Sequence, residues 1–155
     1  METWDRIEHM TARREEFYEK YIARIDTALV EERPFEAVLL IAALMEVRII
    51  SVLTSGEPEP GITPKMGNGL GGKIETMQKY EEDRFYKHIT AKMLTDLYDW
   101  RGRRNDLVHD IAKGGIAPED MDAVAVKIAT DGQELLRPFL AALRRERRVQ
   151  INRGD

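Results

Sequence analysis

The sequence of 155 residues contains no cysteine, which excludes disulfide bonds, thiolate metal sites and cysteine nucleophiles. Long apolar runs are also missing, because the longest lies between Ala37 and Met45 and a membrane helix needs about 20 residues. The first ten residues carry Glu2, Asp5 and Glu8 where a secretory signal needs an unbroken apolar stretch. We therefore expect a cytoplasmic protein without a membrane segment.

An excess of positive charge is missing as well. The chain has 24 lysines and arginines against 28 acidic residues, so its net charge of −4 repels nucleic acid overall. Any site for a polyanion must therefore be local. Two basic clusters could supply such a site. The first comprises Arg101, Arg103 and Arg104, and the second comprises Arg144, Arg145, Arg147 and Arg148. The second is most simply a solvated helix end whose cations complement the helix dipole.

The apolar residues that are present recur with helical spacing, and no segment alternates with the period of a strand. We predict four long helices and one short helix, packed as an all-α up-and-down bundle. The predicted ranges are Thr3–Glu32, Pro34–Thr54, Lys73–Glu82, Arg84–Lys113 and Pro118–Arg148. Residues 1–148 form one domain, 55–72 a flexible loop rich in glycine and proline, and 149–155 a disordered tail.

The fourth of these segments has an arginine where an apolar residue is expected. A helical wheel places one arc of side chains toward the core, namely Phe85, Tyr86, Ile89, Met93, Leu97, Trp100, Leu107, Val108 and Ile111. Arg104 falls within roughly 20° of the centre of this arc. A buried guanidinium needs a carboxylate, a wet cleft or a bound anion, because burying it alone costs several kcal/mol. Glu46, on the apolar second helix, is the candidate carboxylate.

Asn105 and His109 lie beside this arc, four residues apart and hence on one face, and His109 is about 140° around the helix from Arg104. A histidine titrates near neutrality and can move the proton of a 2′-hydroxyl, while an arginine can hold the charge that develops on phosphorus. Asn105 could orient the imidazole or the phosphate. The set suits phosphoryl transfer on RNA without a metal. In the alternative interpretation Arg104 pairs with Glu46, and Asn105 and His109 are polar residues at a packing interface.

The motif Arg104-Asn105-x-x-x-His109, near the carboxyl end of a helix in an all-helical domain, resembles the signature of the HEPN superfamily, the higher-eukaryote and prokaryote nucleotide-binding domains. Leu70-Gly71-Gly72-Lys73-Ile74 resembles the segment before that motif in relatives of the mannitol operon repressor. The resemblance implies a homodimer in which two Arg-x4-His motifs line one cleft. Many members act there as metal-independent endoribonucleases that leave a 2′,3′-cyclic phosphate.

Carried over to this chain, the resemblance implies that Arg104 and His109 are catalytic and that Asn105 supports them. Glu46 is a further supporting residue, since members often have a polar residue on a neighbouring helix. Arg101 and Arg103 are candidate contacts to RNA phosphates.

The function expected from this resemblance is that of a ribonuclease without metal or cofactor, acting as a toxin or defence effector with an antitoxin or regulatory partner. Ile111 stands where one toxin subgroup has a tyrosine, so control by nucleotide transfer onto that tyrosine is not expected. The alternative is a non-catalytic regulatory or binding protein of the same superfamily, which the acidic balance favours. A glycine-rich match to nucleotide-binding loops at 67–73 follows no strand and is set aside.

Overall fold

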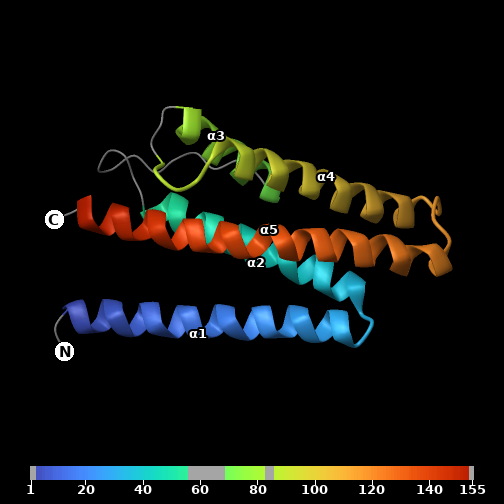
Figure 1. Ribbon diagram of the computed structural model, residues 1–155, viewed down its shortest axis with the longest axis horizontal. Coiled ribbons are helices and arrows are strands. Elements are labelled where there is room, and N and C mark those ends of the chain that lie inside the picture. The colour runs from blue at the N-terminus through green and yellow to red at the C-terminus, as the bar shows by residue number, and fades with distance from the viewer. Residues whose placement is uncertain (1–2, 56–68, 83–85, 154–155) are drawn as a thin grey trace.

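The computed structural model describes the backbone of residues 3–55, 69–82 and 86–153, and the side chains of 15–53, 69–82 and 86–149. Within these residues every regular element is a helix, so the all-α prediction is confirmed. Figure 1 shows the helices, which are α1 (Thr3–Val30), α2 (Pro34–Ser55), α3 (Gly69–Glu82), α4 (Ala91–Ala112) and α5 (Pro118–Arg153). As predicted, four are long and one, α3, is short.

The core lies around α2, which contacts α1, α3 and α5. The four long helices alternate in direction, with α1 on one side of the α2–α5 pair and α3 and α4 on the other (Figure 1). This position explains why α2 is apolar on most of its surface: Ile41, Met45 and Ile49 are fully buried. Each such side chain contributes about 1.5–3 kcal/mol when it leaves water.

The ends of α1 and α2 lie close to their predicted positions. α2 starts at Pro34, where the missing N–H costs no hydrogen bond, and ends one residue beyond Thr54. α1 ends two residues before Glu32, because Glu32 adopts a left-handed φ of 58° and Arg33 N donates to Ala28 O at 2.7 Å. This closes the end of α1 in the manner of a helix C-cap.

The predicted start of the motif helix at Arg84 is wrong. Thr90 is the N-cap of α4, and its hydroxyl accepts a hydrogen bond from Met93 N at 3.2 Å. Just before it, the N–H groups of His88 and Ile89 donate to the carboxylate of Glu146 instead of to a helical carbonyl. Residues 83–85 lie outside the described residues. The end of α4 is close to its prediction, because Gly114 adopts the left-handed φ of 67° that stops the helix.

Two further boundaries differ from the prediction. α3 begins at Gly69 instead of Lys73, so the glycines at 69–72 form a helical turn and not a loop, while 56–68 of the predicted flexible loop lie outside the described residues. α5 continues through Pro138 to Arg153, so residues 149–153 are helical and not a disordered tail. None of the helices in the described ranges has the length and apolarity needed to cross a membrane.

The core face predicted for the motif helix is only partly correct. Leu97, Trp100 and Leu107 are buried, but Val108 is 42% exposed and Ile111 is 37% exposed. The short helix α3 packs along the first part of α4, and the last turns of α4 extend beyond it toward the α4–α5 connection (Figure 1). The apolar periodicity of α4 therefore continues beyond the part of α4 that α3 covers, and this leaves Val108 and Ile111 exposed.

Candidate functional site

Arg104 lies on the core side of α4 and is half-buried. Its Nη2 donates to Oδ1 of Asn105 at 2.9 Å, and its Nε is buried without a hydrogen-bond partner among the described residues. Burial lowers the pKa of Arg104, the charge of Arg101 lowers it further, and the carboxylate of Glu46 partly offsets both effects. The position predicted from the wheel thus carries a guanidinium with an unused donor.

Glu46 does not form the predicted alternative pair with Arg104. Its Oε1 lies 2.9 Å from Nζ of Lys73, at the first turn of α3, and this is the ion pair that Glu46 makes within the described part of the chain. Lys73 is well covered, with 13% of its side chain exposed against 35% for Glu46. Glu46 therefore acts on Arg104 through its nearby charge and not through a direct contact.

Lys73 is the site residue that sequence reasoning missed. The signal for it was the acid at Glu46 on an otherwise apolar helix, which must find a cation when the helix is central. The sequence offered Arg104 as that cation because both were expected in the core. A helical start at Gly69 turns Lys73 inward, and this start was hidden by the glycines that favour a loop.

His109 is exposed in the last turn of α4, and no helix of the described residues buries it. Asn105, one turn earlier, is half-buried and directs its carbonyl oxygen to Arg104. Asn105 thus contacts the arginine of the motif, whereas the sequence suggested contact with the imidazole or a phosphate. Arg104 and His109 remain about 140° apart around the helix, so they face different directions within one chain.

The two neighbouring arginines point to opposite sides of α4. The guanidinium of Arg101 lies over Gly71 of α3, where an added Cβ would stand 2.6 Å from it, and 5.3 Å from the ring of Tyr98. Arg103 pairs with Asp131 of α5 at 2.7 Å. Of these two candidate phosphate contacts, Arg101 acts on Arg104 through its charge. The charge of Arg103 is instead neutralised by Asp131 on the α5 side.

The charges around Arg104 do not cancel. Arg101, Arg104 and Lys73 supply three cations, while Glu46 and Glu75, which accepts a hydrogen bond from Tyr98, supply two acids. The local excess of one positive charge contrasts with the net charge of −4 of the whole chain.

Several large apolar side chains of α1, α2 and α4 are exposed among the described residues. Leu39 and Val47 of α2, eight residues apart and on one face, are 46% and 47% exposed, and Val108 and Ile111 of α4 are similarly open. Phe17 on α1 is 55% exposed and lines a shallow apolar groove with Val47. The groove lined by Phe17 and Val47 is an exposed apolar surface, and such surfaces are often covered by another protein.

The chemistry of this region is that of arginine, lysine, amide and imidazole groups. Among the described residues, no group of three or more histidine and acidic side chains is arranged to hold a metal ion.

Comparisons with known protein families, with curated proteins and with solved structures give no match to this chain.

Proposed function

We propose that the chain is a HEPN-like, metal-independent endoribonuclease that acts as a homodimer, with Arg104 and His109 as its catalytic residues. The observation that supports this most is the half-buried Arg104, whose Nε has no partner among the described residues while Asn105 holds its Nη2. A guanidinium fixed in this way is prepared for the charge that develops on a phosphorus in the transition state.

In the proposed reaction His109 takes the proton of a 2′-hydroxyl and the 2′-oxygen attacks the adjacent phosphorus. The protonated imidazole then gives this proton to the 5′-oxygen of the next nucleotide as the bond from phosphorus to that oxygen breaks. The products are a 2′,3′-cyclic phosphate and a 5′-hydroxyl end. Arg104 binds a non-bridging oxygen of the phosphorane, and Asn105 positions Arg104. Glu46, held by Lys73, keeps Arg104 charged by its proximity.

A second copy is part of this proposal because one chain does not bring the two catalytic groups together. Arg104 and His109 face directions about 140° apart on α4. In this proposal a partner copy covers exposed apolar residues of α2 and α4, namely Leu39, Val47 and Val108. A dimer related by a two-fold axis would let His109 of one copy approach Arg104 of the other.

Cleavage of single-stranded RNA in the presence of a chelator tests the proposal. We expect wild-type protein to cut and both His109→Ala and Arg104→Ala to lose about 10²–10⁴-fold in rate, the range for loss of an acid–base or electrostatic group. Arg137→Ala is the matched control, since Arg137 is an exposed arginine of α5. Its ion pair with Asp26 is weak, because the two charged groups are 3.8 Å apart. If purified dimer cuts nothing, or if the two site variants cut as fast as Arg137→Ala, the chain is not a nuclease of this kind.

The binding alternative gives a different result in the same assay. The acidic balance of 28 against 24 charges favours a regulatory protein in which Arg104 holds a phosphate without chemistry. Such a protein would retain RNA on a filter in an Arg104-dependent manner and leave it intact. A toxin role adds a requirement for a neutralising partner, which copurification of the product of a neighbouring gene would test.

A further inference from the structure

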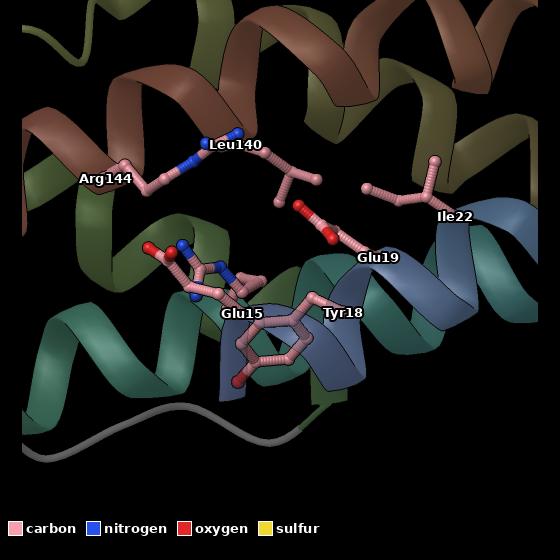
Figure 2. Close-up of a pocket in the computed structure, with 7 residues that line it drawn as sticks. Glu15, Tyr18, Glu19, Ile22, Leu140 and Arg144 are labelled. Atoms are coloured by element: carbon pink, nitrogen blue, oxygen red, sulfur yellow. The ribbon is translucent and has the colours of Figure 1, made fainter. Parts of the chain in front are cut away.

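A small pocket between α1, α2 and α5 encloses a buried arginine. Its lining consists of Glu15, Tyr18, Glu19 and Ile22 from α1, Arg48 from α2, and Leu140 and Arg144 from α5, and Figure 2 draws these side chains and labels all of them except Arg48. The space open to the centre of a water molecule is about 50 Å³. A single buried water needs only ~10–15 Å³ by this measure, so the pocket has room for more than one.

Arg48 has no acidic partner in this pocket. Only 6% of Arg48 is exposed, yet none of the ion pairs formed by the described residues includes it. Its guanidinium carbon lies 4.5 Å from the centre of the Tyr18 ring. Burial lowers the pKa of Arg48, Tyr18 offsets part of this effect, and the charges of Arg147 and Arg144 lower the pKa further. A guanidinium so covered is unfavourable unless an anion joins it.

The charges of two more arginines, both on α5, act on Arg48. Arg144 lines the pocket, and Arg147 follows three residues later on the same side of the helix, close enough to act on Arg48. The Nε of Arg147 is buried and has no hydrogen-bond partner among the described residues. The pocket lining thus holds the nearly buried guanidinium of Arg48 and the cation of Arg144, and Arg147 adds a third positive charge close to Arg48 but outside the lining.

The acids at the pocket do not neutralise these cations. Glu15 and Glu19 are exposed residues of α1, and neither forms an ion pair with Arg48, Arg144 or Arg147 in the described part of the chain. Figure 2 shows Arg144 approaching from α5 and Glu19 from α1, on opposite sides of the opening. In the lining, Arg48 and Arg144 are matched in number by Glu15 and Glu19, and Arg147, outside the lining, adds one positive charge near Arg48.

We propose that this pocket binds a phosphate-sized oxyanion through Arg48 and Arg144, which line it, with the charge of Arg147 nearby. Guanidinium groups match tetrahedral oxyanions because they donate paired N–H groups to two oxygens at once. The small volume and the apolar walls of Ile22 and Leu140 admit one phosphate group, either free or at the end of a nucleotide.

This site is separate from the proposed nuclease centre. Arg48 follows Glu46 by two residues on α2, which places their side chains about 160° apart around the helix. The pocket opens between α1 and α5, whereas the Lys73–Glu46 pair lies between α2 and α3. Oxyanion binding therefore stands or falls independently of RNA cleavage.

Titration calorimetry with inorganic phosphate tests the proposal, with chloride at equal ionic strength as the blank. We expect binding to wild type, an affinity at least ~10-fold weaker for Arg144→Met, and a change of no more than ~2-fold for Arg145→Met, as loss of a charge-assisted pair requires. Arg145 is the exposed neighbour that does not line the pocket, so it is the matched control. Absence of binding to wild type, or equal losses in the two variants, overturns the proposal.

The same titration with AMP identifies the source of the phosphate. If AMP binds more tightly than inorganic phosphate, the ligand is a nucleotide or an RNA end. If inorganic phosphate binds more tightly, the ligand is the free ion. Either result supports recognition of a phosphate group by the arginines. Arg48→Met is expected to abolish binding, and retention of binding by this variant contradicts the assignment. Where Arg48→Met does not fold, Arg144→Met decides.

A pair of glutamate substitutions separates an anion site from an internal ion-pair network. Removing both carboxylates by Glu15→Gln and Glu19→Gln should tighten phosphate binding several-fold, because like-charge repulsion at the opening is relieved. If the glutamates are instead the counter-ions of Arg48, the double variant lowers the melting temperature and gains no affinity, and the proposal is wrong.

Discussion

The ammonium of Lys73 lies 2.9 Å from Oε1 of Glu46 and fastens the first turn of α3 to α2 beside Arg104. Removing Glu46 deprives the well-covered Lys73 of the carboxylate it pairs with and the half-buried Arg104 of a charge that offsets its burial. We expect Glu46→Gln to lower the free energy of unfolding by about 1–2 kcal/mol, between the values for exposed and buried pairs. Lys73→Met should cost less, because it removes one of the cations around Arg104. Urea denaturation of both variants checks this order, and the reverse order contradicts it.

A mixing experiment tests the dimeric arrangement. If Arg104 of one copy acts with His109 of the other, a heterodimer of Arg104→Ala and His109→Ala chains retains one complete Arg–His pair. We expect the mixture to regain activity after the two inactive proteins are unfolded and refolded together, up to about a quarter of wild type for random pairing of equal amounts. Activity that stays absent while mixed dimers are present would show that one chain supplies both groups.

Packing of α4 against α5 depends on a glycine. Trp100 donates its indole N–H to Ile128 O at 2.8 Å, and its ring lies so close to Gly132 that an added Cβ would stand 2.7 Å from it. Trp100 is only 1% exposed and cannot move aside. We expect Gly132→Ala to destabilise the protein by about 1–3 kcal/mol through overpacking.

Gly102, on α4, is the matched control for this prediction. An added Cβ there meets no atom within 4 Å, and the residue is in the helix interior. Gly102→Ala should therefore stabilise the protein by about 0.5–1 kcal/mol through helix propensity. Opposite signs for the two substitutions in thermal unfolding confirm the packing argument, and the same sign refutes it.

Much of the fold follows from the sequence because its strongest signals are local. Pro34 marks the first residue of α2, and the apolar run that follows it marks α2 as a buried helix. Gly114 marks the end of α4. The start of α4 was not predictable in this way, because the N–H groups of His88 and Ile89 are satisfied by Glu146, more than fifty residues away. A helical pattern of apolar residues cannot reveal that a distant carboxylate replaces helical hydrogen bonds.

The candidate site divides along the same line. The half-buried position of Arg104 follows from the wheel, since periodicity reports which side of a helix faces the core. The partner of Glu46 could not be predicted from the wheel, because Lys73 and Arg104 are both cations at plausible positions. Only the packing of α3 against α2 determines that Lys73 forms the ion pair. The exposure of Val108 and Ile111 depends on where α3 begins, which is also a tertiary property.

Glu146 is the most deeply buried acid of the described residues, with 1% exposed. Its carboxylate accepts hydrogen bonds from the backbone of His88 and Ile89 and so fixes the segment that leads into α4. Replacement by alanine leaves two buried N–H groups unsatisfied, and we expect a loss of about 2–4 kcal/mol. Hydrogen exchange should show the largest loss of protection at residues 88 and 89. Unchanged protection there would mean that the carboxylate does not hold the segment.

Tyr86 makes stability depend on alkaline pH. Burial raises the pKa of Tyr86 well above its ordinary value of 10.0, and Tyr80 and Glu146 raise it further. Above pH 10 the folded protein therefore holds a proton on Tyr86 that the unfolded chain releases, so this contribution to stability is complete below pH 10 and is lost as the pH rises beyond it. Tyr86→Phe removes the titrating group, and the free energy of unfolding of the variant should fall less steeply above pH 10 than that of wild type. Urea denaturation of the two proteins at neutral pH and at pH values above 10 measures the difference. Parallel pH profiles for the two proteins would mean that Tyr86 titrates alike in the folded and unfolded states.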